Sequence, residues 1–125
     1  MAEHEGMLDK RLVAYAIEII RLTQAMPKTM AGTVIAKQVL RSGTSAGANY
    51  REAKGAESRA DFVHKLQVVI KELRETDYWL TLARESHLLP AAQLDDALRE
   101  CSELTAMAVR SVVTVKRNMA HGKSE

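Results

Sequence analysis

The chain has 125 residues, of which 46% are hydrophobic and 27% charged, and its net charge is +2. This length predicts one domain, and the apolar fraction suffices for a single buried core, which excludes an intrinsically disordered protein. Two prolines, six glycines and few aromatic residues argue against a turn-rich all-β domain. No apolar run reaches the ~18 residues that span a bilayer, and the charged N-terminal stretch lacks a signal region. We therefore expect a cytoplasmic protein, and its single cysteine agrees with a reducing compartment.

Proline, glycine and capping residues divide the chain into four helical segments. Pro27 and Pro90 interrupt helices because proline lacks a backbone N–H and disfavours helical geometry in the residue before it. Gly55 is predicted as a C-cap, and Ser58 followed by Asp61 is typical of a capping box. The predicted helices cover residues 5–26, 29–54, 58–88 and 90–119 of one domain, 1–125, with a disordered tail at 120–125.

Apolar residues recur at alternating spacings of four and three in three of these segments, as in the a and d positions of a heptad repeat. The three stripes are Leu8, Leu12, Tyr15, Ile19, Leu22 and Met26; Phe62, Leu66, Val69, Leu73, Thr76, Leu80 and Ala83; and Leu94, Leu98, Cys101, Thr105, Ala108, Val112, Val115 and Met119. Because the connections are short, consecutive helices must run antiparallel. The pattern predicts an all-α, up-down-up-down four-helix bundle.

The second segment departs from this pattern. Its stripe, which runs Ile35, Val39, Ser42, Ala46, Asn49 and Ala53, turns small and polar halfway along, and Ser45 and Glu52 flank it. Buried serine or asparagine needs a hydrogen-bond partner. A basic line lies on the opposite face and consists of Lys37, Arg41 and Arg51, followed by Lys54. We predict these four cations as candidate contacts to nucleic-acid phosphates.

The third segment carries a second stripe, opposite its core stripe. This stripe contains Val68, Glu72, Glu75, Trp79 and Leu82, with Tyr78 adjacent. Large apolar groups left exposed on one stripe are typical of a partner surface, so Val68, Tyr78, Trp79 and Leu82 are predicted as an oligomer interface. Glu72 and Glu75 lie one turn apart and could form a general acid/base pair, but salt bridging across an interface explains them equally well.

Two short motifs suggest alternative chemistry. Gly43-x-Ser45-x-Gly47 matches the nucleophile elbow of hydrolases, but it lies in a helical segment of a chain without predicted strands. Asp61 and His64 have the i, i+3 spacing of di-iron bundles.

With Glu18 and Glu52 as additional carboxylates, Asp61 and His64 would make a metal-dependent bundle enzyme, although a second acid–histidine pair is missing. Cys101 occupies an apolar stripe and is interpreted as a buried hydrophobic residue. We therefore predict no catalytic residue, cofactor or metal site, and keep the metal-dependent enzyme as an alternative.

Three stretches, read together, resemble one known family: residues 38–53 (QVLRSGTSAGANYREA), 58–66 (SRADFVHKL) and 71–80 (KELRETDYWL). They are similar to the bacterial four-helix-bundle proteins encoded in intervening sequences of large-subunit ribosomal RNA genes. The accessory variability determinant of diversity-generating retroelements is a relative in the same family. The resemblance covers roughly residues 8–117.

The resemblance implies an antiparallel bundle assembled as a ring-like homopentamer. For the retroelement relatives it also implies a basic surface that binds nucleic acid and a reverse transcriptase. The positions that match the family's polar line are Ser42, Ser45, Asn49 and Glu52 in the second helix, with Glu72 and Glu75 in the third. No catalytic residues transfer from the family. The chain departs from the motif at Gly43, Gly47 and Tyr50-Arg51.

Residues and resemblance together favour a non-enzymatic, homo-oligomeric adaptor. It would contact RNA or DNA through a basic face and bind a protein partner such as a reverse transcriptase. The alternatives are the metal-dependent bundle enzyme and a purely structural protein-interaction module. Periodicity alone does not distinguish a pentamer from another ring. It shows a second apolar stripe, but not the rotation between neighbouring subunits that sets the number of copies in a ring.

Overall fold

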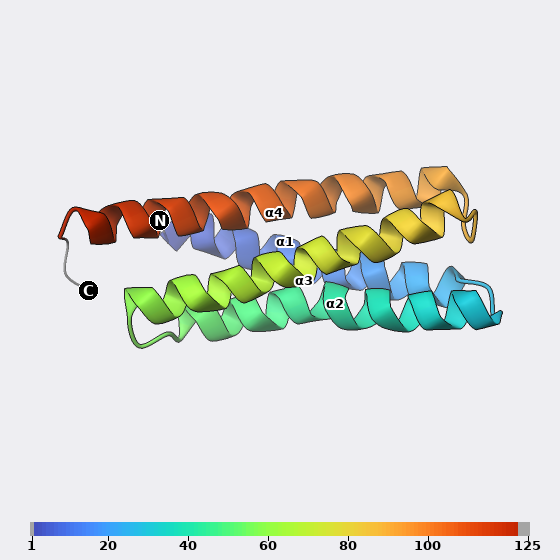
Figure 1. Cartoon of the computed structure of the whole chain (residues 1–125), viewed down its shortest axis with the longest axis horizontal. Helices are drawn as coiled ribbons and strands as arrows, with labels where there is room; N and C mark the ends of the chain where they lie inside the picture. Colours follow the sequence, from blue (N-terminus) through green and yellow to red (C-terminus); the bar gives the residue numbers. More distant parts are fainter. Residues whose placement is uncertain (1, 123–125) are drawn as a thin grey trace.

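The computed structural model describes residues 2–122. It contains the helices α1 (Ala2–Ala25), α2 (Met30–Lys54), α3 (Arg59–Glu85) and α4 (Ala91–Ala120). The helices run alternately up and down, so the start of α1 and the end of α4 lie at the same end of the bundle as the α2–α3 connection (Figure 1). Each helix packs against its neighbours in sequence and α4 closes on α1, whereas the backbones of the diagonal pairs stay further apart throughout the described residues. The predicted all-α four-helix bundle is confirmed.

Side chains at the helix starts explain where α2 and α3 begin. The hydroxyl of Thr29 accepts a hydrogen bond from the backbone N–H of Gly32 over 3.1 Å. Ser58 accepts from the N–H of Asp61 over the same distance, as the predicted capping box requires. The carboxylate of Asp61 reaches back to the N–H of Glu57, one residue before the position that a full capping box uses. Ser58 therefore supplies one half of the predicted motif.

The ends of α3 and α4 differ from the predicted bounds. The third helix ends at Glu85 and not at 88, because Ser86 caps it and His87 takes a left-handed backbone conformation with a φ of 59°. The fourth helix continues through Ala120, with His121 and Gly122 in a turn. Of the tail predicted as disordered, residue 120 thus belongs to α4 and residues 121–122 to its closing turn, while residues 123–125 lie outside the described residues.

The core is built from the predicted stripes, most completely on α1. All six residues of the first predicted core stripe, Leu8 to Met26, are buried. On α4 the stripe is only partly correct, because Leu98, Thr105 and Val115 are half-buried and Met119 is exposed. Other α4 side chains complete the core: Ala97, Leu104 and Met107. The reason is that α4 packs against both α3 and α1, so its buried face is wider than a two-position seam.

Gly43 sets the close approach of α2 to α1, and Gly47 lies one turn further along the same face. A Cβ atom added to Gly43 would lie 2.9 Å from Cγ1 of Ile19, and one added to Gly47 would lie 3.5 Å from Cβ of Leu12. Between them, the Ser45 hydroxyl donates to the carbonyl of Arg41 within the helix. The Gly-x-Ser-x-Gly string is therefore a helix-packing element, and it lacks the strand-to-helix turn that a nucleophile elbow needs.

Candidate interaction surfaces

A polar seam joins α2 to α3 at the middle of the bundle. Arg41 makes ion pairs with both Glu72, at 3.3 Å, and Glu75. Ser42 follows Arg41 on α2. Its hydroxyl lies 2.7 Å from the hydroxyl of Thr76 on α3, and both side chains are fully buried. The seam therefore holds the two helices in register within one chain. Glu72 and Glu75 are both ion-pair partners of the Arg41 guanidinium in this seam.

The rest of the family's polar line also makes contacts within the chain. The amide of Asn49 donates to the carbonyl of Ser45 over 2.9 Å. Glu52 lies 3.8 Å from the ammonium group of Lys65 on α3. Together with the seam, these contacts engage the polar line within α2, at Ser45 and Asn49, and between α2 and α3, at Ser42 and Glu52.

The predicted oligomer interface forms a surface that we call the α3 patch: Val68, Tyr78, Trp79 and Leu82. Tyr78 is 58% exposed and Leu82 36% exposed, whereas Val68 is half-buried. Trp79 is also half-buried: its ring packs against the core, and its indole N–H donates to Glu75 over 3.1 Å. The two aromatic rings meet edge to face with centroids 5.0 Å apart. Tyr78 and Leu82 are thus the members that remain open to a partner.

A second apolar surface, which we call the α1 stripe, was missed by the sequence analysis. It consists of Val13, Ile17 and Ile20, which are 41%, 45% and 42% exposed. Their spacing of four and three places them on one helix face, away from the core stripe. The spacing of these residues is visible in the sequence. However, a helix that carries apolar residues on two faces is easily read as a helix with one wide buried face. Lys10 and Arg21 border the stripe and are exposed.

The four cations predicted to bind nucleic acid do not form one free basic line. Arg41 belongs to the polar seam, and Arg51 pairs with Asp9 of α1 at 3.0 Å. The hydrogen bond from Arg51 lowers the pKa of Asp9, and the nearby charge of Lys54 adds to that effect. Only Lys37 and Lys54 are exposed and, within the described residues, outside any ion pair.

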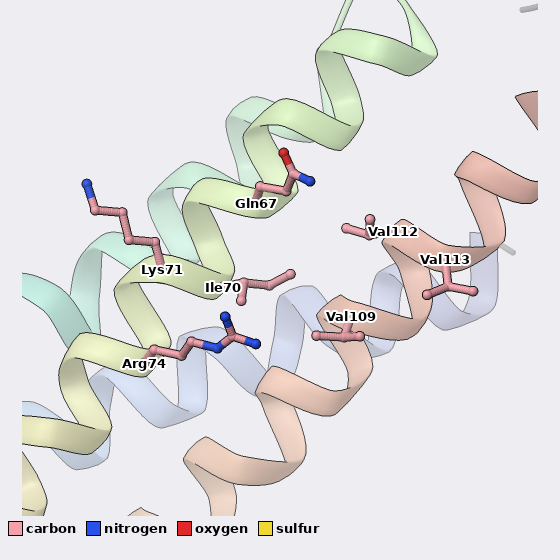
Figure 2. Close-up of a pocket in the computed structure, with 7 residues that line it drawn as sticks. All are labelled: Gln67, Ile70, Lys71, Arg74, Val109, Val112 and Val113. Carbon is pink, nitrogen blue, oxygen red and sulfur yellow. The ribbon is translucent and has the colours of Figure 1, made fainter.

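A groove of about 370 Å³ runs between α3 and α4, and we call it the α3–α4 groove. Its lining residues are Gln67, Ile70, Lys71, Arg74, Val109, Val112 and Val113 (Figure 2). The guanidinium of Arg74 reaches toward Val109, whereas Lys71 extends away from α4 at the outer edge (Figure 2). The sequence pattern does not predict this groove, because it exists only once α4 packs beside α3.

The four residues of the alternative metal site do not converge. His64 is exposed, the carboxylate of Asp61 accepts from the N–H of Glu57 just before α3, and Glu52 pairs with Lys65 of α3. Burial raises the pKa of Glu18, and the carboxylates of α4 that lie near it, Asp96 and Glu100, add to the shift. Throughout the described part of the chain, no group of three His, Cys, Asp or Glu side chains is placed to hold a metal ion.

Cys101 is buried, as predicted, and its thiol donates to the carbonyl of Leu73 over 3.1 Å. Burial raises the pKa of this thiol to about 11, so it stays protonated at neutral pH. A protonated, buried thiol is a poor nucleophile and a poor metal ligand.

The fold and these surfaces define the class of the protein: a small up-and-down four-helix bundle with an internally paired polar seam and apolar outer faces. No helix within residues 2–122 is long and apolar enough to cross a membrane. Residues 9–110 match the model of the 23S rRNA-intervening sequence protein family. The chain belongs to this family, which confirms the resemblance seen in the sequence.

A solved structure supports the same assignment. It is the crystal structure of a protein of unknown function from the S23 ribosomal protein family of Bacteroides thetaiotaomicron. That protein is 33% identical to this chain, and the match covers 87% of this chain and 97% of the other with a TM-score of 0.82. No curated protein matches the chain.

Proposed function

We propose that the protein is a non-enzymatic, homo-oligomeric adaptor that acts in the cytoplasm. The observation that carries the proposal is the presence of two apolar surfaces, the α1 stripe and the α3 patch, on a bundle whose core is already complete. Exposed apolar side chains gathered on one face are typical of protein–protein contacts. The helices that carry them occupy diagonal corners of the bundle, so the two surfaces face in different directions.

We propose that the α1 stripe of one copy pairs with the α3 patch of the next, because both surfaces are apolar and keep exposed side chains on the folded bundle. Contacts between unlike surfaces are head-to-tail, and they close into a ring when the rotation per subunit divides a full turn. The family resemblance favours a pentamer among such rings.

Light scattering coupled to size exclusion tests the assembly, with Ile17→Glu and Leu82→Glu as the two interface variants. We expect the wild type to form a discrete oligomer, because its two surfaces pair in turn around the ring. Each variant alone should be monomeric, since each lacks one of the two surfaces. An equimolar mixture should give a dimer, because one intact stripe can still meet one intact patch.

Val113→Glu is the matched control for these variants. Val113 is 47% exposed on α4, outside both surfaces, so its substitution should leave the oligomer intact. A wild type that is monomeric at micromolar concentration would refute the proposed assembly. If the two variants stay monomeric when mixed, the head-to-tail pairing is refuted. An oligomeric wild type would then show self-association through another surface.

The adaptor would carry an anionic partner such as RNA or DNA, together with a protein such as a reverse transcriptase. Support for this second function comes from the C-terminal half of α4, where Arg110, Lys116 and Arg117 occur without an acidic residue after Glu103 in the described chain. Of the predicted basic line, Lys37 and Lys54 are the two cations that make no ion pair within the described residues. A ring repeats each cation several times, which raises affinity for a polyanion.

Titration of labelled RNA and DNA duplexes at several salt concentrations tests this second function. A variant carrying Lys37→Ala and Lys54→Ala should bind more weakly and flatten the salt dependence by up to about two units of slope per subunit, since each phosphate contact contributes about one. Arg51→Ala is the control, because that guanidinium is engaged by Asp9. No binding at low salt would leave a structural module as the function.

A further inference from the structure

We propose that the α3–α4 groove is a docking site for an acidic amphipathic helix of a partner protein. The site is independent of the self-association surfaces, because it lies between α3 and α4 on residues that belong to neither the α1 stripe nor the α3 patch. Grooves between packed helices commonly receive the apolar face of a further helix.

The floor of the groove is aliphatic. Ile70 from α3 and three valines from α4 form it: Val109, Val112 and Val113. Val113 remains 47% exposed, so the floor is incompletely covered by the bundle itself. A floor of branched aliphatic side chains suits leucine-type anchors spaced by three and four residues. It offers no aromatic ring for base stacking, which disfavours a single-stranded nucleic acid as the occupant.

The edge of the groove is cationic. Arg74 reaches over the floor toward Val109, and Lys71 stands on the outer edge of α3 (Figure 2). Lys116 continues the basic edge one turn after Val112 on α4. Within the described residues none of these three cations belongs to an ion pair, and no carboxylate lines the groove. Unneutralised cations beside an apolar floor are complementary to a helix that carries glutamate or aspartate along its apolar stripe.

The same charges disfavour a second copy of this chain as the occupant. The α1 stripe is aliphatic and could fill the floor by shape, but Lys10 and Arg21 border it. Docking it would bring these cations near Arg74 and Lys71, and like charges at an interface select against a partner. The occupant is therefore an acidic helix from another protein.

Fluorescence anisotropy with two designed peptides tests the proposal on the full chain. Both are helix-stabilised peptides of about 18 residues, or five turns, with leucines at i, i+3/i+4 and i+7. One carries glutamates along the edge of the leucine stripe, and its twin carries lysines at the same positions. We expect the glutamate peptide to bind, to weaken with added salt, and to bind at least about tenfold more tightly than its twin.

Two groove variants and two matched controls locate the binding. Arg74→Glu and Val113→Glu should each weaken the glutamate peptide at least about tenfold, because the first reverses the charge of the edge and the second places an anion in the floor. Lys28→Glu, in the connection before α2, and Val34→Glu, on α2 where Val34 is 50% exposed, make the same types of change away from the groove. They should leave the affinity unchanged.

Several outcomes would overturn the proposal. Equal affinity for the two peptides, no binding of the glutamate peptide, or indifference to the groove variants would each do so. Loss of RNA or DNA binding in both groove variants without any peptide binding would make nucleic acid the occupant. If Val113→Glu abolishes the oligomer that the wild type forms, the occupant of the groove is a second copy of this chain. The oligomer measurement is separate, so failure here leaves the proposed assembly standing.

Discussion

The hydroxyl groups of Thr76 and Ser42 lie 2.7 Å apart between α3 and α2, with no exposure of either side chain. The Ser42 hydroxyl donates to the carbonyl of Gln38, so its oxygen is free to accept from Thr76. The proton of Thr76 is shared with the carbonyl of Glu72, at 2.8 Å. This pair is the one buried polar contact between α2 and α3 side chains in the described chain, and it lies next to the Arg41 ion pairs.

Thr76→Val should destabilise the protein by about 1–2 kcal/mol, because it preserves shape but removes a buried hydrogen bond to Ser42. In a Ser42→Ala background the same substitution should cost less, since the partner is already gone. Urea unfolding of the four proteins, at one protein concentration, measures the coupling. Additive effects of the two substitutions would show that the hydroxyl contact contributes nothing.

Gly43→Ala and Gly47→Ala should act in opposite directions. A methyl group at Gly43 meets the branched carbon atoms of Ile19 at 2.9 Å, so α1 must shift, at a cost of about 1–3 kcal/mol. At Gly47 the nearest atom is at an ordinary contact distance, so alanine should stabilise the helix by up to about 1 kcal/mol. Thermal unfolding followed by circular dichroism compares the two. Stabilisation by both substitutions would contradict the close approach at Gly43.

Asp9→Asn should reduce stability at neutral pH but have little effect in acid. The Arg51 hydrogen bond lowers the folded-state pKa of Asp9 below its usual 3.8, so the stabilisation is present above that value and is lost as pH falls through the lowered one. Urea unfolding between about pH 7 and pH 2 checks this. The gap between wild type and variant should be constant above about pH 5 and vanish in strong acid. Arg51→Gln should give the same profile, and a gap that persists at low pH would contradict the assignment.

Tyr15→Phe should be neutral or stabilising by up to about 1 kcal/mol. The ring is 1% exposed, and its hydroxyl makes no well-formed hydrogen bond within the described residues, because its nearest polar neighbour is the weakly polar thiol of Cys101. Burial raises the pKa of this phenol, so the group stays neutral at any ordinary pH. Equilibrium unfolding in urea measures the change, and Tyr15→Leu, which also removes ring volume, should cost about 1–3 kcal/mol as a control. A loss of more than about 1 kcal/mol in Tyr15→Phe would point to a hydrogen bond to an internal water.

The bundle was predictable because a helix that buries one face repeats apolar residues at spacings of three and four. Leu8 to Met26 follow that rule and are all buried. The same logic located Ser58 at the start of α3 and the interruptions at Pro27 and Pro90, since caps and prolines act through neighbouring backbone groups. These are local effects, and a sequence contains all of the atoms that produce them.

The surfaces were harder to predict. Trp79 was placed on the oligomer interface, but in the structure its ring leans against the core and its N–H is satisfied by Glu75. Arg41 and Arg51 were assigned to a free basic line, although each finds a carboxylate on a neighbouring helix. Periodicity predicts the direction in which a side chain leaves its own helix, but not which residue of a neighbouring helix it meets.

By itself, the sequence determined the number of helices, their antiparallel order, their breaks and most of the core, because hydrogen bonds and apolar periodicity within a helix involve residues close in the chain. Only the tertiary structure decided which polar groups are engaged and which surfaces remain open. Arg41 and Glu75 are 34 residues apart and meet only because α2 and α3 pack in one register. The α3–α4 groove likewise depends on the spacing of two helices, and such distances are set by the packing of the whole bundle.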